Sequence, residues 1–270
     1  MEQYSGFARV YDLFMDNVPY DEWVQYLCGL LEMNGVAADG THHPLVCELG
    51  CGTGSVTRRL SERGYDMIGI DISDEMLQIA REREPQGDDR ILYLQQDMRE
   101  FELYGTVAAV VSLCDSMNYI TDSDDLLRVF RLVNNYLDPG GIFIFDLNTS
   151  YYYSRVLGEQ TICENRDEGS FIWENYYDPE THINEFDMTI YYKSSMNGGN
   201  GREHYVRCEE THFQRAYTLG EIRRLLKQAG METLGIYAAC TMEAPTRTTE
   251  RVYVAARTRK AQTDMSTANA

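Results

Sequence analysis

The stretch "CELGCGTGSVT", residues 47–57, decides the fold. Its glycines at positions 50, 52 and 54 follow the apolar run "PLV" and come directly before a helical pattern. Because glycine has no side chain, such a loop lets the backbone approach a ligand closely. The spacing G-x-G-x-G differs from the dinucleotide pattern G-x-G-x-x-G, and no Gly-Lys-Ser/Thr follows that would make a phosphate-binding P-loop.

Short apolar runs alternate with helical patterns on both sides of this loop. The runs are typical of buried parallel strands and cover residues 44–49, 66–70, 91–95, 107–113 and 142–147. Helical patterns cover residues 20–35, 55–64, 73–84, where Pro85 gives the stop, and 122–137, where a Pro-Gly-Gly turn follows. This alternation predicts an α/β fold, a doubly wound and mostly parallel sheet whose ligands bind at the C-terminal strand ends.

The sequence pattern changes between residues 161 and 215, where long polar and aromatic strands are separated by the turns "DPET" and "MNGGNG". We expect an antiparallel insertion of three strands that covers the ligand-binding crevice at the C-terminal strand ends. The α/β pattern resumes with a capping box, Thr218 and Glu221, and two more strands, 231–239 and 251–257.

The chain therefore divides into four predicted parts. These are an N-terminal segment with a helix (1–40), the α/β core (41–160 and 216–258), the β insertion (161–215) and a flexible tail (259–270).

The composition limits the partners and the compartment. With 24 basic and 43 acidic residues the net charge is −19, and a nucleic-acid partner needs a basic surface. No apolar run approaches the roughly 18 residues of a membrane span, and the first residues do not resemble a signal peptide. Seven cysteines without a C-x-x-C pair are typical of reduced thiols. We expect a cytoplasmic protein without nucleic-acid or membrane partners, and monomer and homodimer stay open.

A metal site is tested by the polar residues of one predicted strand. Four possible metal ligands are at even-numbered positions and so share one face of this strand: His204, Cys208, Glu210 and His212. At about 3.3 Å per residue, the two histidines lie about 26 Å apart, too far to bind one ion. We expect no metal.

An acidic residue, Asp71, ends the second strand, 21 residues beyond Gly50. A carboxylate in this place can accept hydrogen bonds from both hydroxyls of a ribose. The loop and Asp71 together favour a ribose-bearing ligand in which a pyrophosphate is not required.

These motifs resemble those of class I S-adenosylmethionine-dependent methyltransferases over nearly the whole chain. "CELGCGTG", "IGIDIS", "QQDM" and "VAAVVSLCDSMNYI" are similar to the first four motifs of that family. The resemblance implies a Rossmann-like sheet of seven strands and S-adenosylmethionine as cofactor. It implies the loop against the methionine moiety, Asp71 on the ribose, Asp97 with Met98 at the adenine, and Leu113 near the amino group. The candidate cofactor-binding residues are Tyr11, Glu48, Gly50, Gly52, Asp71, Ile72, Asp97, Met98 and Leu113.

Three outer stretches resemble a bacterial group of YqeM-like methyltransferases: "YSGFARVYDLFM", "CDSMNYI" and "EETHFQRAYTLGEI". Sugar-amine and glycine N-methyltransferases are similar in carrying an N-terminal segment and a β insertion. Because these relatives act mostly on small molecules, the resemblance implies transfer to a nitrogen or oxygen of a small acceptor.

Methyl transfer is an in-line displacement, so holding the acceptor behind the methyl group supplies much of the catalysis. Tyr4 and Tyr11 could place aromatic faces near the sulfonium, or pack against the sheet. His212 could take a proton from the acceptor, or be a structural hydrogen-bonding residue. Asp115, Asn118 and Tyr119 follow the fourth strand and could orient the acceptor, or cap the next helix.

Three other functions stay open at this point. A protein or RNA methyltransferase would need an open or electropositive groove at the mouth. A non-catalytic S-adenosylmethionine-binding module would leave no substrate volume beyond the methyl group. An NAD-dependent oxidoreductase is disfavoured by the glycine spacing.

Overall fold

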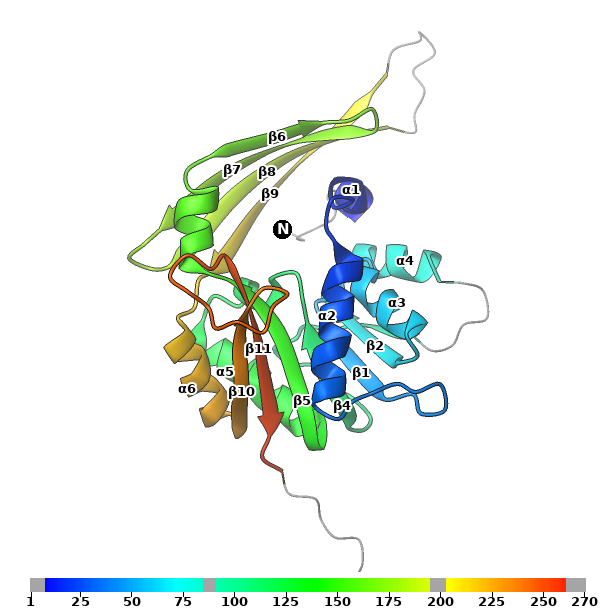
Figure 1. Cartoon of the computed structure of the whole chain (residues 1–270). Coiled ribbons are helices and arrows are strands. Elements are labelled where there is room, and N and C mark those ends of the chain that lie inside the picture. Colours follow the sequence, from blue (N-terminus) through cyan, green and yellow to red (C-terminus); the bar gives the residue numbers. More distant parts are fainter. Residues whose placement is uncertain (1–7, 85–90, 195–202, 261–270) are drawn as a thin grey trace, which may run out of the picture.

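The computed structural model describes residues 8–84, 91–194 and 203–260. Figure 1 shows an α/β core, a second curved sheet beside it, and helix α1 facing that second sheet. The predictions on Tyr4, on the stop at Pro85, on the turn "MNGGNG" and on the tail beyond Lys260 lie outside the described residues.

A seven-stranded sheet forms the core, in the order β10-β11-β5-β4-β1-β2-β3. In this sheet β11 alone runs in the direction opposite to the other six strands. This confirms the predicted doubly wound, mostly parallel sheet. The strands are β1 Leu45–Leu49, β2 Asp66–Asp71, β3 Ile91–Gln95, β4 Val107–Ser112, β5 Leu137–Asn148, β10 Met231–Ala238 and β11 Arg251–Thr258.

Helices cover both faces of this sheet and bury two apolar clusters. On one face, α5 and α6 pack residues such as Phe130 and Leu225 against the strands. On the other face, α2 and α3 contribute residues such as Leu27 and Leu60. The helices are α1 Ala8–Phe14, α2 Tyr20–Met33, α3 Ser55–Glu62, α4 Asp74–Glu82, α5 Ser123–Tyr136 and α6 Leu219–Gln228, with a 3₁₀ helix η1 Ser116–Tyr119 and a π-helix η2 Tyr152–Leu157. None of the helices in the described residues is long and apolar enough to span a membrane.

Polar caps explain where the helices begin. The Asp122 carboxylate accepts hydrogen bonds from the first backbone amides of α5, and Thr218 Oγ1 accepts one from Glu221 N in α6. The Glu221 carboxylate, however, is occupied by Ser123 and Arg215. Its side chain thus joins α6 to α5 and β9.

The predicted three-stranded insertion is wrong in one respect, because the second sheet has four strands. Its order is β6-β7-β8-β9, with β6 Thr161–Asn165, β7 Gly169–Asp178, β8 Ile183–Lys193 and β9 Tyr205–Arg215. The missed strand, β6, is five residues long and no residue in it is fully buried. Such a short polar edge strand leaves little hydrophobic pattern to detect.

The expected Pro-Gly-Gly turn is also different in the structure. The start of β5 includes residues 139–141, and the register with β4 shifts between the pairs Val107 with Leu137 and Ala109 with Ile142. The three residues form a bulge within the strand.

Candidate functional site

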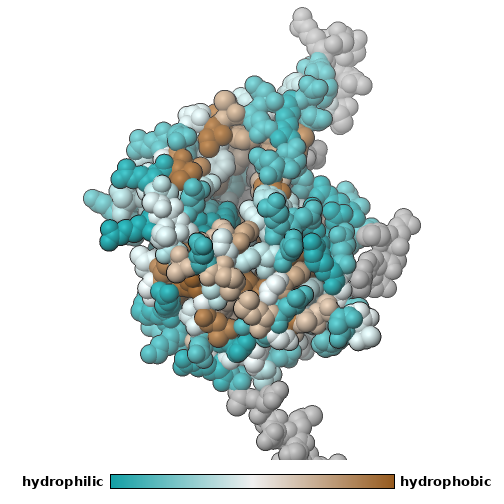
Figure 2. Space-filling view, viewed as in Figure 1, coloured by the Kyte–Doolittle hydropathy of each residue, from teal (hydrophilic) through white to brown (hydrophobic). Residues whose placement is uncertain are grey.

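A cavity of about 690 Å³ lies where β1, β2 and β4 end and continues beneath the second sheet. Figure 2 shows the molecular surface hollowed between the core and this sheet. The cavity volume is within the range of about 300–1,000 Å³ that is usual for small-molecule sites.

The glycine loop forms one wall, and its shape is set by backbone contacts. Gly50 N and Cys51 N both donate to Ile70 O, at 2.8 and 3.0 Å. A Cβ at Gly50 would lie 2.5 Å from Ser116 Oγ, whereas a Cβ at Gly52 would meet no atom within 4 Å. Both residues have positive φ, 73° and 53°. Gly50 is therefore required by close packing, and Gly52 leaves open space on the cavity side.

Asp71 lies at the end of β2 and lines the cavity. Its carboxylate accepts hydrogen bonds from Gly52 N at 2.8 Å and Ser73 N at 2.9 Å. Burial raises the pKa of Asp71, while these backbone donors favour the charged form. Each carboxylate oxygen can accept a further bond from a ligand.

Three residues continue this wall beyond Asp71. The Ile72 side chain is 54% exposed although it is apolar, and Met98 lines the cavity with it. Asp97 also lines the cavity and is fixed by Arg99, whose backbone N and Nε both donate to Asp97 Oδ1. Burial alone would raise the pKa of Asp97, but the hydrogen bonds and charge of Arg99 together lower it.

Glu48 and Leu113 lie deeper in the same wall, and both are buried. Thr57 Oγ1 donates a hydrogen bond to the Glu48 carboxylate. Burial raises the pKa of Glu48 to about 8, and the nearby charge of Asp71 adds to the effect. Glu48 is therefore mostly protonated at neutral pH when the cavity holds no ligand.

The loop after β4 has an unusual backbone at the centre of the cavity. Cys114 and Asp115 both have positive φ, 58° and 53°, a conformation that costs free energy for residues other than glycine. Asp115 is held by Asp146, which accepts from its N at 2.9 Å, and by Arg251, which donates to its Oδ1 at 2.7 Å. Gln214 donates to Asp115 Oδ2 at 2.6 Å. The loop is thereby tied to β5, β11 and the second sheet.

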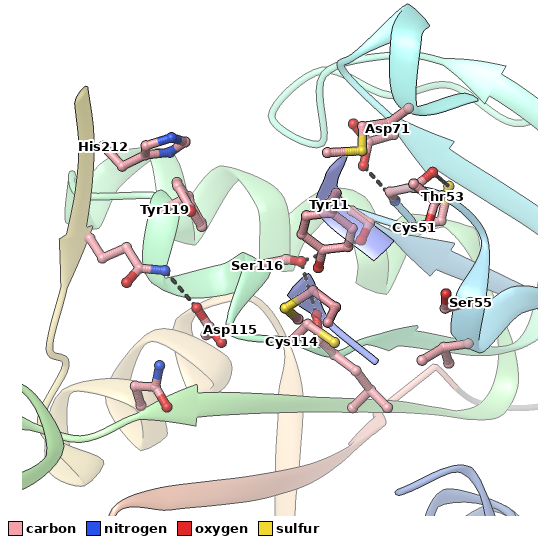
Figure 3. Close-up of a pocket in the computed structure, with 18 of the residues that line it drawn as sticks. Tyr11, Cys51, Thr53, Ser55, Asp71, Cys114, Asp115, Ser116, Tyr119 and His212 are labelled. Carbon is pink, nitrogen blue, oxygen red and sulfur yellow. Dashed lines mark hydrogen bonds between the residues drawn. The ribbon is translucent and has the colours of Figure 1, made fainter. Parts of the chain in front are cut away.

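His212 and Tyr119 lie on the far side of the cavity from Asp71 (Figure 3). The His212 ring stacks on Phe186 at 4.7 Å between centroids, and Tyr119 meets it edge-on at 5.8 Å. His212 Nε2 lies 3.2 Å from a carboxylate oxygen of the buried Glu210. Among the described residues, no group of three histidines, cysteines or acids could hold a metal ion.

Asn118 is turned away from the cavity. Its amide nitrogen donates to Asn148 O and Arg215 O, and its amide oxygen accepts from Asn148 N. Because these contacts bury the side chain between η1, β5 and β9, we leave Asn118 out of the proposed site.

Helix α1 closes a third side of the cavity with Tyr11. Burial raises the pKa of Tyr11, which also forms a hydrogen bond with Tyr20. The next residue, Asp12, accepts from Thr53 Oγ1 at 2.8 Å and so joins the helix to the glycine loop. At the end of α1, Phe14 packs edge-on against Phe171 of β7, with 4.8 Å between centroids.

Apart from His212, the sequence analysis did not single out the residues of the second sheet that line the cavity. They are Ile162, Glu164, Phe171, Trp173, Phe186, Met188 and Gln214. The alternation in "SFIWENYY" places Phe171 and Trp173 on one face, but nothing local shows which face is turned to the core. Arg251 was also missed, since its partner Asp115 lies 136 residues away in the sequence.

Comparison with known proteins agrees with this geometry. The family described as "Methyltransferase domain" matches residues 46–141, from β1 into β5. A protein of Bacillus subtilis (strain 168) with the name "Putative methyltransferase YqeM" is 33% identical over 258 residues, which cover 95% of this chain and 98% of YqeM. The chain belongs to the S-adenosylmethionine-dependent methyltransferases.

Solved structures place the methyltransferase in the same fold. A structure of an S-adenosylmethionine-dependent methyltransferase from Clostridium acetobutylicum ATCC 824 has a TM-score of 0.80 and 28% identity, covering 95% of this chain and 99% of that one. The sugar N-methyltransferase KedS8 from Streptoalloteichus sp ATCC 53650 has a TM-score of 0.72 and covers 93% of both chains. At 16% identity, that likeness concerns the fold alone. This methyltransferase is an enzyme with S-adenosylmethionine as its cofactor.

Proposed function

We propose that this methyltransferase transfers a methyl group to a nitrogen or oxygen of a small molecule. One observation carries the proposal: the cavity extends from the glycine loop to the aromatic inner face of the second sheet, leaving room for an acceptor beyond a cofactor. KedS8, named as a sugar N-methyltransferase, is an example of this fold with a small acceptor.

The proposed cofactor site uses the wall from Tyr11 to Leu113. The Asp71 carboxylate would accept hydrogen bonds from ribose hydroxyls, and Ile72 and Met98 would contact the adenine, with Asp97 at its edge. The open space at Gly52 fits a ligand lying against the backbone. Gly50, Glu48 and Leu113 would border the methionine moiety, and Tyr11 would cover it.

The cofactor supplies a methyl group on a sulfonium when it is bound, and the chain supplies orientation. Asp115 and Tyr119 would position the acceptor at the centre of the cavity. His212, held by Glu210 and Phe186, would take the proton that the acceptor loses.

Two alternative functions have less support. A protein or RNA methyltransferase would need a wide or electropositive mouth, yet the chain carries a net charge of −19 and aromatic residues line the acceptor side. A non-catalytic binding module would need no volume beyond the cofactor. The charge and the cysteine pattern also support an enzyme that works in the cytoplasm without nucleic acid. Monomer and homodimer both stay open.

A transfer screen tests the proposal. The protein is incubated with S-adenosylmethionine and a panel of small amines and hydroxyl compounds, and the S-adenosylhomocysteine formed is measured. We expect formation above the background with a subset of the panel. Tight binding of S-adenosylhomocysteine without any acceptor-dependent formation would favour the binding module.

A further inference from the structure

We propose that the acceptor is a cationic amine without a phosphate group, bound between Asp115 and an aromatic wall of the second sheet. This inference rests on the proposed function and narrows its substrate class. It depends on three features of the acceptor side of the cavity: its aromatic rings, its excess of carboxylates over cations, and the salt bridges that already engage its arginines.

Aromatic rings from several elements line the acceptor side. Trp173 and Phe186 lie with their ring centroids 4.7 Å apart, and Phe186 stacks on His212. Phe14 of α1 meets Phe171 edge-on. Ring faces attract cations through their quadrupole, most strongly where water is excluded, and they also bind apolar bodies. A ring wall of this kind suits an ammonium group on an apolar frame.

Carboxylates outnumber cations in both charge clusters on this side. Asp115 and Asp146 share one guanidinium, that of Arg251. At the edge of the second sheet, Glu164 and Asp16 share that of Arg166. Each cluster therefore keeps one more negative charge than positive when its carboxylates are ionised. The field in this part of the cavity favours a cation.

The arginines that line the cavity are already engaged. Arg251 bonds to Asp115 and Asp146, and Arg99 pairs with Asp97 and Asp125. No other arginine or lysine of the described residues lines the cavity. A phosphate usually requires an available guanidinium, ammonium or helix N-terminus. Among the helix starts that line the cavity, those of α3 and α4 belong to the proposed cofactor wall, and that of α5 is capped by the Asp122 carboxylate. A phosphorylated acceptor would instead meet the carboxylate excess, so the site selects against it.

The cofactor does not account for these charges. Asp71 lies on one side of Figure 3, and Asp115, Tyr119 and His212 lie on the other, with Tyr11 and Ser116 between them. In the proposed cofactor site the ribose and adenine contacts belong to the Asp71 side, so the sulfonium end of the cofactor would face the acceptor. The net negative charge around Asp115 and Glu164 therefore acts on a second ligand.

The transfer balances for an amine. The bound ammonium first gives one proton to His212, the base proposed above. The nitrogen lone pair then forms a bond to the methyl carbon, and the bond from carbon to sulfur breaks with its electron pair going to sulfur. The products are a methylated ammonium ion and neutral S-adenosylhomocysteine, and His212 passes its proton to solvent.

Three probes of similar size, each with one phenyl ring, test the charge preference. Calorimetry measures the binding of 2-phenylethylamine, 2-phenylethanol and phenylacetate, which are positive, neutral and negative at pH 7, to the protein saturated with S-adenosylhomocysteine. We expect the amine to bind about tenfold or more tightly than the alcohol, and phenylacetate to bind most weakly. Equal binding of amine and alcohol, preference for phenylacetate, or no binding of any probe would overturn the inference.

Two variants identify the groups responsible. Asp115→Asn removes the charge while asparagine still tolerates the positive φ, so it should reduce the preference for the amine to about threefold or less. Trp173→Leu should weaken the amine more than the alcohol. Asp187→Asn removes the same charge on the exposed outer face of β8 and is the control, for which we expect the full preference.

The result separates two failures. If S-adenosylhomocysteine binds and only hydroxyl compounds are methylated, the proposed function stands and the amine inference is wrong. If Asp115→Asn keeps its melting temperature and its S-adenosylhomocysteine affinity but also keeps the full amine preference, Asp115 does not select the acceptor.

Discussion

Asp71 and Asp115 are both carboxylates at strand ends, but different groups hold them in place. Asp71 is held by backbone amides of the glycine loop and the turn after β2. Asp115 is held by the side chains of Arg251 and Gln214. The first arrangement fixes an acceptor for hydroxyl groups, and the second carries an ionic network from the core to the second sheet. The surroundings of Asp71 therefore suit the methyl donor, and those of Asp115 suit the methyl acceptor.

Replacing Asp71 tests the donor site. Asp71→Ala should weaken S-adenosylhomocysteine binding by about 2–3 kcal/mol, roughly 30- to 150-fold, because the ribose loses its acceptor. Asp71→Asn keeps one oxygen acceptor and should lose less. Calorimetry measures both affinities, and an unchanged affinity of Asp71→Ala would refute the assignment.

Replacing Glu48 tests the effect of burial on stability. Burial raises the pKa of Glu48 in the folded protein to about 8, from an ordinary value of 4.5. Between these two pH values, Glu48 is protonated in the folded protein and ionised in the unfolded chain. This contribution to the free energy of unfolding is fully present below pH 4.5. It falls by about 1.4 kcal/mol per pH unit as the pH rises from 4.5 to about 8, and above that pH it is lost.

Urea unfolding without cofactor measures the consequence. Glu48→Gln should match the wild type near pH 5 and be more stable near pH 8, because glutamine can still accept the Thr57 hydrogen bond and cannot ionise. A difference between the two proteins that does not change with pH would contradict the raised pKa.

The residues of the candidate site differ in how far the sequence could predict them. Asp71, Asp97 and the glycines follow strands directly, so local pattern alone brings them to one edge of the sheet. Arg251 and Gln214 reach Asp115 only through the tertiary fold, 136 and 99 residues away in the sequence. Asn118 shows the reverse case, since its position after β4 predicted a site residue but its amide bonds turn it inward.

At the scale of elements, Gly52 in the glycine loop and Gly40 outside it offer a matched pair of substitutions. Gly52 and Gly40 both have positive φ, 53° and 81°, and an added Cβ would meet no atom within 4 Å at either. Gly52→Ala and Gly40→Ala should therefore each lose roughly 1–2 kcal/mol of stability through backbone strain. Only Gly52→Ala should also lose S-adenosylhomocysteine affinity, since only Gly52 of this pair lines the cavity. Equal affinities would show that the ligand does not approach this backbone.

Helix α1 joins the glycine loop to the second sheet, and its far end rests on Arg166. This side chain pairs with Asp16, bonds to Leu13 O and lies over the Phe14 ring. Arg166→Met removes these polar contacts but keeps an apolar stem, so we expect α1 to open more often and S-adenosylhomocysteine to dissociate several-fold faster. Stopped-flow displacement measures the rate. The control is Arg207→Met, which breaks an exposed pair with Glu209; similar rates in both variants would contradict the role of α1.

The elements were predictable where the hydrophobic pattern is strong. The core strands are short, apolar and bounded by turns, and each predicted run coincides with an observed strand, which it exceeds by at most one residue. In the second sheet, one face contacts the cavity, and the outer face mixes polar residues with the exposed Ile172, Tyr176 and Phe213. The edge strand β6 has no fully buried residue. A count of strands there depends on pairing with β7, which local sequence does not encode.

At the scale of the whole molecule, two sheets of different kinds divide the cavity. The parallel sheet presents backbone amides and carboxylates at its strand ends, as a nucleoside requires. The antiparallel sheet presents rings and a few polar groups, as a small organic acceptor requires. The negative charge of the chain suits such an acceptor and disfavours a nucleic acid.

The most direct test of a small-molecule methyltransferase follows the methyl group itself. The protein is given S-adenosylmethionine labelled on the methyl carbon, together with pools of small amines and hydroxyl compounds, bulk RNA and bulk protein, and the label is measured in each fraction. We predict label in the small-molecule fraction, above all in the amines. Label confined to the RNA or protein fraction would contradict the account.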